Sequence, residues 1–219
     1  MILMRAIVLL LGCTALNVAA TEVAKVADVE FDRSPEALKR GAEVVTRVCL
    51  GCHSMQYVKY RSLQEVGFTN AELDTLRGTH GLDEPLVSAI TDEMAIELFG
   101  LVPPDQSLLA KARKGGANYI YTLLTSYEKD TKGDVTNSIF PGLRMPDIMD
   151  YASADAAQRA TLQQQVRDVA VFLEWASDPH AAERRQIGVY VIAYLIVLTF
   201  LLYLIKRRVW ARLPPPVAH

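Results

Sequence analysis

The distribution of apolar residues divides the chain into two strongly hydrophobic stretches and a mixed middle. The first twenty residues and residues 187–205 are far more apolar than the sequence between them. Residues 187–205 carry no charged side chain, and a helix of this length spans about 28 Å, close to the hydrocarbon thickness of a bilayer. We therefore predict a transmembrane helix at residues 187–205. A buried helix of a soluble protein is the alternative interpretation.

The charges that flank this span predict its orientation. Four basic residues follow it within residues 206–212, whereas the two arginines that precede it are partly offset by Glu183. Basic residues are enriched on the cytoplasmic side of membrane helices. The pattern predicts a single-pass protein of a bacterial inner membrane, with residues 21–186 in the periplasm and residues 206–219 as a cytoplasmic tail.

The N-terminal apolar stretch is typical of a secretory signal. A basic start at Arg5 precedes a short apolar core, and the small residues Val18-Ala19-Ala20 precede Thr21. We predict a signal peptide at residues 1–20 that is cleaved after Ala20. Two alternatives stay open: a retained membrane anchor, and lipoprotein processing at Cys13 in the run Leu10-Leu11-Gly12-Cys13.

Helical periodicity dominates the middle of the chain. Ser34-Pro35 is a good helix start, and apolar residues then recur at helical spacing up to Cys49. A second long helix is expected over residues 155–176, ending at Asp178-Pro179. Shorter helices fit residues 71–77, 89–99 and 118–126. No stretch alternates in the manner of a strand, so the sequence predicts a mostly α domain.

The charge of this domain limits its partners. Five of the 23 basic residues lie outside residues 21–186, whereas all 25 acidic residues lie inside, which leaves a net charge near −7. Acidic residues are densest between Glu65 and Asp105, where nine face only Arg77. Such a field favours a basic partner and makes nucleic acid implausible. A solvated surface that keeps the protein soluble is the alternative interpretation.

The motif Cys49-Leu50-Gly51-Cys52-His53 is the C-x-x-C-H pattern of covalent haem attachment. The two thiols can each add to one vinyl group of a haem, and the neighbouring imidazole can coordinate the iron. We predict one haem c, bound through Cys49 and Cys52, with His53 as a metal ligand. A thioredoxin-like dithiol or half of a zinc site are the rivals, but a second cysteine pair is missing and a dithiol has no need of His53.

Several residues could supply the second iron ligand. The candidates are Met55, Met94, Met145, Met149, His80 and His180. Met55 follows the attachment motif too closely to reach the opposite face of a ring, and Met94 and Met149 can be core residues. Met145 lies in a Pro- and Gly-rich segment, residues 140–146, which can hold a side chain over a ring without helical packing. Spacing therefore favours Met145, and a thioether ligand is typical of electron-transfer haems.

Longer blocks of the sequence resemble the cytochrome c1 family, the haem subunit of the cytochrome bc1 complex, in its bacterial type. The run from Cys49 to Arg61 is similar to that family's extended signature, C-x-x-C-H-S-M-x-Y-V-x-Y-R. Further similar blocks are Pro103-Pro104-Asp105, Ala112-Arg113-Lys114-Gly115-Gly116 with Tyr119, Phe140-Pro141-Gly142 to Met145, and Phe172-Leu173-Glu174-Trp175-Ala176. The chain differs from the family in having Leu98-Phe99-Gly100 before the paired prolines and Pro146-Asp147 after the methionine.

The resemblance implies a fold and a set of site residues. The fold is a class I cytochrome c-like haem domain with loop insertions, followed by one C-terminal transmembrane helix. His53 and Met145 become the two axial ligands, Arg113 and Tyr119 face the haem propionates, and Pro103 and Pro104 form a wall against the ring.

The resemblance also implies a function: electron transfer within quinol:cytochrome c oxidoreductase, from a Rieske iron–sulfur protein to a c-type cytochrome. The implied partners are these two proteins, cytochrome b and membrane lipid, in a dimeric complex. None of the chain's residues would act as acid, base or nucleophile. A freestanding membrane-tethered shuttle cytochrome is the main alternative, although only eleven residues separate Trp175 from Ile187. A haem enzyme or gas sensor with an open iron position is the third.

Overall fold

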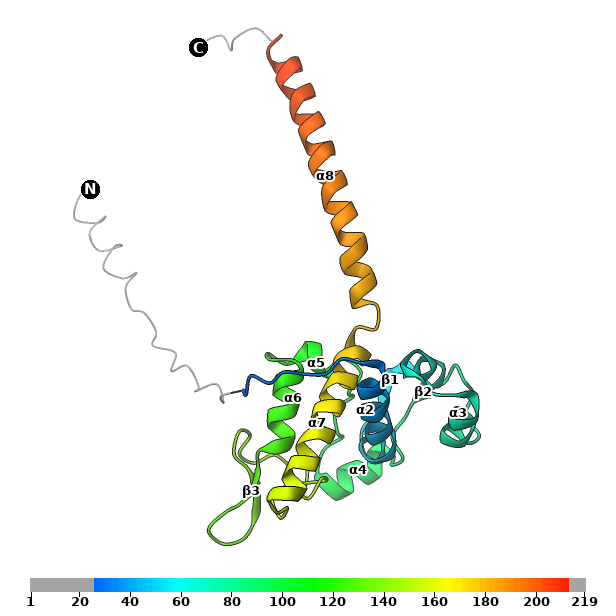
Figure 1. The fold of residues 1–219 in the computed structure, drawn as a ribbon, viewed down its shortest axis with the longest axis vertical. Coiled ribbons are helices and arrows are strands. Elements are labelled where there is room, and N and C mark those ends of the chain that lie inside the picture. Colours follow the sequence, from blue (N-terminus) through cyan, green and yellow to red (C-terminus); the bar gives the residue numbers. More distant parts are fainter. Residues whose placement is uncertain (1–25, 213–219) are drawn as a thin grey trace, which may run out of the picture.

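The structure is a computed structural model that describes residues 26–212. The predicted signal peptide and the last seven residues of the predicted tail lie outside this range. The described part is mostly helical, as the sequence predicts, with a helical domain followed by one long projecting helix (Figure 1).

Two long helices form the centre of the domain. Helix α2 (Pro35–Arg47) begins after Ser34, whose Oγ accepts a hydrogen bond from the amide of Ala37 at 3.2 Å. Helix α7 (Ala156–Ser177) begins at a capping box between Asp155 and Gln158. The predicted bounds of both helices agree with the structure to within two residues.

Helices α2 and α7 pack unusually closely. Gly41 is buried on α2, and a Cβ atom at this position would lie 2.0 Å from the backbone oxygen of Asp168 on α7. The side chains of Val45, Val169 and Phe172 are buried in the core beside this contact. A hydrogen-bonded ion pair between Arg40 Nε and Asp168 Oδ2, at 2.7 Å, closes one edge of the interface.

Shorter elements surround this pair. They are η1 (Cys49–Gly51), β1 (Met55–Lys59), η2 (Tyr60–Val66), α3 (Asn70–Arg77), β2 (Pro85–Leu86), α4 (Asp92–Phe99), α5 (Leu109–Ala112), α6 (Ala117–Thr125), β3 (Tyr127–Lys129) and β4 (Val135–Asn137). Strand β1 pairs with β2, and β3 pairs with β4, both antiparallel. These strands are too short to produce the alternation that a sequence pattern needs, and so only the helices were predicted.

Helix α8 (Ala181–Trp210) leaves the domain and projects from it (Figure 1). Its length and apolar composition suffice to cross a membrane, and it contains the whole predicted span of residues 187–205. None of its residues is buried against the domain. A soluble protein does not leave such a helix exposed on every side, which disfavours the interpretation as a buried core helix.

The junction between the domain and α8 is held by Asp178, the residue that ends α7. Its carboxylate pairs with Arg184 in the first turns of α8 and with Lys111 Nζ on α5, the latter at 2.7 Å. Hydrogen bonds from Arg184 and Lys111 lower the pKa of Asp178. The start of α8 is therefore tied to two elements of the domain.

Candidate functional site

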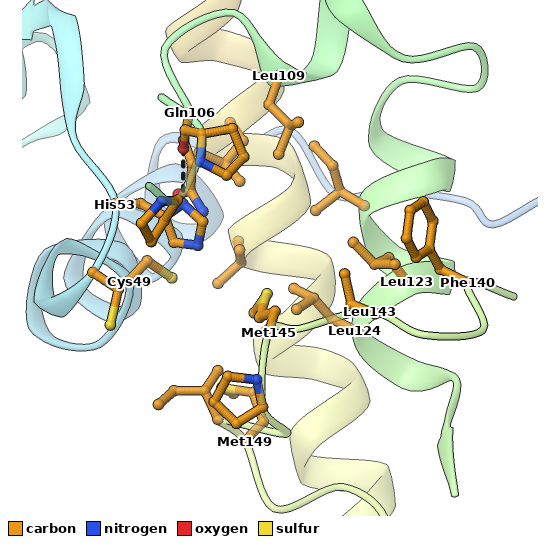
Figure 2. A pocket seen from close by; sticks show the side chains of 18 of the residues that line it. Cys49, His53, Gln106, Leu109, Leu123, Leu124, Phe140, Leu143, Met145 and Met149 are labelled. Carbon is orange, nitrogen blue, oxygen red and sulfur yellow. Dashed lines mark hydrogen bonds between the residues drawn. The ribbon is translucent and has the colours of Figure 1, made fainter. Parts of the chain in front are cut away.

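A pocket of about 380 Å³ lies between η1, helices α6 and α7, and the loop that follows β4 (Figure 2). Its volume falls in the range typical of small-molecule and cofactor sites. Most of the wall is apolar and includes Leu109, Leu123, Leu124, Phe140 and Leu143. The site is thus suited to a mainly apolar group with a few polar contacts.

His53 enters the pocket with a defined orientation. Its ring is mostly buried, and Nδ1 donates a hydrogen bond to the carbonyl oxygen of Pro104 at 2.8 Å. A carbonyl can only accept, so the proton of the neutral ring lies on Nδ1 and the lone pair of Nε2 is free. Burial lowers the pKa of His53, although the bond to Pro104 opposes this effect. A neutral imidazole fixed by a backbone carbonyl is well prepared to bind a metal.

The two cysteines of the motif line the same pocket and are not joined by a disulfide. Cys49 lies in η1, directly after α2, and Cys52 ends this short turn. Burial raises the pKa of the Cys49 thiol to about 11. A thiol in this state is a poor thiolate nucleophile, which disfavours a thioredoxin-like dithiol. Among the described residues no cluster of His, Cys, Asp and Glu could form a zinc site.

All eight site residues predicted from the sequence line this one pocket: Cys49, Cys52, His53, Pro103, Pro104, Arg113, Tyr119 and Met145. Arg113 is exposed at the end of α5, and Tyr119 is half-buried in the first turn of α6. Within residues 26–212, the guanidinium of Arg113 and the hydroxyl of Tyr119 form no hydrogen bond or ion pair. Two polar groups at the rim of an apolar pocket are therefore available to a ligand.

The structure narrows the choice of a second metal ligand. Met55 is fully buried in the core, Met94 is 48% exposed on α4, His80 stacks on Tyr60, and His180 is exposed at the start of α8. These four do not line the pocket, whereas Met145 and Met149 do. Figure 2 shows both methionines on the loop that follows β4. Met149 is also packed against the hydrophobic core, as expected for a structural residue.

The loop that carries Met145 is organised by the β3–β4 hairpin. The buried Tyr127 of β3 donates a hydrogen bond from its hydroxyl to the backbone oxygen of Met145 at 2.9 Å. Asn137 of β4 bonds to the backbone of Leu123 through Nδ2 and accepts from the amide of Phe140 at 3.1 Å. Burial raises the pKa of Tyr127 to about 12, so its hydroxyl stays a donor at physiological pH.

Sequence reasoning missed two polar residues of the pocket. Gln106 is 7% exposed and lines the pocket, and its Oε1 is buried with no partner among the described residues. Arg144, the neighbour of Met145, also lines the pocket and bonds to backbone oxygens of another segment. Gln106 belongs to no recognisable motif, and the block of residues 140–145 that contains Arg144 gives this arginine no role, so only the tertiary structure places both side chains here.

The residues present fit a covalently attached haem. The donor set combines two unpaired thiols, an imidazole with a free Nε2 and a thioether, on a mainly apolar wall. The orphaned Oε1 of Gln106 and the free groups of Arg113 and Tyr119 could supply polar contacts to such a group. Together with α8, the site defines the class of haem-binding electron-transfer proteins that carry a membrane anchor.

Comparison with known proteins specifies the family. The sequence model of the protein family described as the Cytochrome C1 family matches residues 27–88 and 83–213 of this chain. Cytochrome c1 of Rhodospirillum rubrum is 33% identical over 79% of this chain and 80% of its own length. The mitochondrial cytochrome c1 haem protein of Kluyveromyces lactis is 31% identical over 83% of this chain and 72% of its own length. A chain of a solved hyperthermophilic respiratory Complex III aligns over 97% of both chains with 22% identity and a TM-score of 0.47. The chain belongs to the cytochrome c1 family.

Proposed function

We propose that this chain is the electron-transfer haem subunit of a respiratory cytochrome bc1 complex. It receives an electron from a Rieske iron–sulfur protein and passes it to a c-type cytochrome. The observation that supports this most strongly is the convergence of all eight candidate residues, drawn from four separated stretches of sequence, on one apolar pocket. Family membership adds the relatives' role as cytochrome c1.

The roles of the residues follow from their chemistry. Cys49 and Cys52 would form the two thioether bonds, His53 would bind the iron through Nε2, and Met145 would bind from the loop after β4. A haem bound in this way supplies a one-electron couple whose potential is raised by a thioether ligand. If His53 and Met145 both held the iron, the protein would leave no position open for oxygen or peroxide. This arrangement favours electron transfer over the enzyme or gas-sensor alternative.

The pocket rim suits the acidic edge of a haem. Arg113 and Tyr119 have no partners among the described residues, and a guanidinium forms strong hydrogen bonds with carboxylates. We assign both to the haem propionates. Pro103 and Pro104 form the adjoining wall, and Pro104 in addition holds His53 through its carbonyl oxygen.

The junction at Asp178 supports a subunit over a freestanding tethered shuttle. A shuttle needs a flexible link between its haem domain and its anchor, whereas here one ion pair joins Arg184 of α8 to Asp178, and a second joins Asp178 to Lys111 of α5. We propose that residues 1–20 are a cleaved signal, that residues 21–186 form the periplasmic haem domain, and that residues 187–205 cross the inner membrane beside cytochrome b. The basic residues that follow the span favour a cytoplasmic C-terminus. We also propose that the complex is a dimer.

Purification of the tagged full-length protein from its own membranes in mild detergent tests the proposal. Haem staining after denaturation should follow this chain, and a Cys49→Ala, Cys52→Ala double variant should lose the stain. Cytochrome b and a Rieske protein should co-purify, with quinol-driven reduction of cytochrome c. If the stained protein instead purifies alone while another haem subunit occupies the complex, the tethered shuttle is correct.

A further inference from the structure

Arg144 connects two largely exposed segments that both contribute to the pocket wall, residues 92–102 and 138–150, which we call the mouth of the pocket. Its Nη1 donates hydrogen bonds to the backbone oxygens of Phe99 and Gly100, each at 3.2 Å. Phe99 is the last residue of α4, and Gly100 is its C-terminal cap. Arg144, Phe99 and the neighbouring Met145 all line the pocket. The side chain that precedes Met145 therefore reaches back to the end of a helix on a different segment.

The contact is chemically favourable at this position. The last carbonyl groups of a helix lack partners within the helix, and they carry the negative end of its dipole. A guanidinium beside them supplies both donors and a positive charge. No basic residue lies in the last turn of α4 itself, so Arg144 provides this interaction from outside the helix.

Gly100 is fitted to the guanidinium in two ways. Its φ angle is +72°, in the left-handed region that favours glycine. A Cβ atom at this position would also lie 2.4 Å from Nη1 of Arg144. A side chain here would displace the guanidinium from the carbonyl groups, which means that the contact requires both residues.

Helix α4 depends on this contact because little else holds it. Ala95 is its only buried residue, and Met94, Ile96 and Leu98 are exposed. Across the described part of the chain, no other hydrogen bond joins residues 92–102 to residues 138–150. The bonds of Arg144 are thus the polar link between the two sides of the pocket mouth.

We propose that Arg144 is a positioning residue that holds α4 against the loop of Met145 and so keeps the Met145 thioether in place. The inference rests on the proposed role of Met145 as an iron ligand. Tyr127 holds the backbone oxygen of Met145 from the hairpin side, and Arg144 holds the same loop from the α4 side. Loss of either anchor lets the loop move away, and an external ligand then competes better for the iron.

The test uses the full-length, haem-loaded protein in detergent. Two spectroscopic readouts apply: the charge-transfer band of methionine bound to ferric iron, and the affinity for imidazole added as an external ligand. Arg144→Gln should weaken the band and raise the imidazole affinity about tenfold, which corresponds to ~1.4 kcal/mol. Arg144→Lys keeps the positive charge and a single donor nitrogen, so its band and its imidazole affinity should lie between those of the wild type and of Arg144→Gln. Gly100→Ala should weaken the band and raise the imidazole affinity as Arg144→Gln does. The variant that combines Gly100→Ala with Arg144→Gln should differ little from either single variant, because both changes remove the same contact.

Matched controls separate this effect from strain and charge. Gly133→Ala changes a glycine with φ of +89° and open space around it, so it tests left-handed strain alone. Arg47→Gln removes an exposed positive charge near Cys49 without touching the mouth of the pocket. Both should leave the band and the imidazole affinity unchanged.

A Met145→Leu variant distinguishes the two levels of the argument. If Met145→Leu retains the methionine band, the proposed ligand is wrong. If Met145→Leu loses the band while Arg144→Gln and Gly100→Ala keep it, together with wild-type imidazole affinity, then only the role of Arg144 is overturned. Should Arg144→Gln not accumulate with haem, Arg144→Lys and Gly100→Ala decide the question by the same readouts.

Discussion

The imidazole Nδ1 of His53 donates a hydrogen bond of 2.8 Å to the backbone oxygen of Pro104, which lies 51 residues further along the chain. The bond links the attachment motif to the paired prolines and fixes which ring nitrogen carries the proton. Because the ring is largely buried, it has little freedom to turn. The two segments therefore present the Nε2 lone pair to the pocket as one unit.

The choice between the two methionines of the pocket leads to the first prediction. Met145→Leu should keep the haem attached but lower its reduction potential by roughly 0.1–0.3 V, within the range of about 0.8 V that axial ligands control. Met149→Leu, a change of similar volume on the same loop, should leave the potential close to that of the wild type. A redox titration of both variants checks this. The opposite result would make Met149 the ligand.

A second prediction concerns Tyr127, whose hydroxyl bonds to the backbone oxygen of Met145. Tyr127→Phe removes one buried hydrogen bond and leaves a carbonyl without its partner. We expect a loss of about 1 kcal/mol in the free energy of unfolding. Urea unfolding followed by haem absorbance measures it. Tyr57→Phe is the matched control because Tyr57 is 74% exposed, and an equal loss there would show that the bond to Met145 is not the cause.

A third prediction concerns the contact between α2 and α7 at Gly41. Alanine at this position would place its Cβ 2.0 Å from the backbone oxygen of Asp168, and backbone cannot move as a flexible side chain can. We expect Gly41→Ala to lower the free energy of unfolding by about 3 kcal/mol, the upper end of the usual cost of overpacking. Gly51→Ala, where nothing lies within 4 Å, is the control. Equal unfolding midpoints for the two variants would contradict the argument.

Much of this architecture could be predicted from sequence because its signals are local. Ser34 marks the start of α2 and Asp178 the end of α7, and apolar periodicity within each segment indicates the two long helices. An uncharged run indicates the core of α8. The spacing of Cys49, Cys52 and His53 indicates haem attachment from the sequence alone, with no knowledge of the tertiary structure. These features depend on neighbours within a few residues, which a sequence pattern records directly.

The remaining features depend on contacts between distant segments. The β3–β4 hairpin pairs only three residues in each strand, so no alternation indicates it. Arg144 resembles any surface arginine until the fold brings it to the end of α4, and Gln106 resembles any surface glutamine until it is buried. The convergence of Arg113 and Tyr119 on the rim was expected only from the family resemblance, since a basic run such as residues 111–114 is ordinarily solvated.

A fourth prediction follows from the carboxylate of Glu72 at the start of α3. It bonds to Lys39 Nζ at 2.8 Å and to the amide of Thr69 at 2.7 Å. Both bonds lower the pKa of Glu72, from 4.5 to about 2, and the bond from Lys39 has the larger effect. A lowered folded-state pKa contributes stability that is complete above pH 4.5 and is lost as the pH falls through about 2.

Glu72→Gln should therefore be less stable than the wild type at pH 7, and the difference should shrink between pH 4.5 and pH 2. Urea unfolding at several pH values measures it, with Glu65→Gln as a control for removal of an exposed charge in the preceding segment. A difference that stays constant down to pH 2 would show that the bonds of Glu72 do not stabilise the folded state.

The last prediction concerns the acidic residues of α4. Asp92, Glu93 and Glu97 are exposed on a helix whose end, Phe99, lines the pocket, so their charge lies within two helical turns of the pocket. A basic electron acceptor would be drawn to this side of the domain, and neutralising the three residues should slow its reduction by roughly tenfold at low ionic strength. At 1 M salt, where the screening length is about 3 Å, the difference should vanish. Stopped-flow kinetics with a basic c-type cytochrome measures both conditions.

Neutralising Asp28, Glu30 and Glu36, exposed carboxylates that do not line the pocket, removes the same charge and should have a much smaller effect. An equal effect of the two triple variants would mean that net charge, rather than a docking surface on α4, controls the encounter.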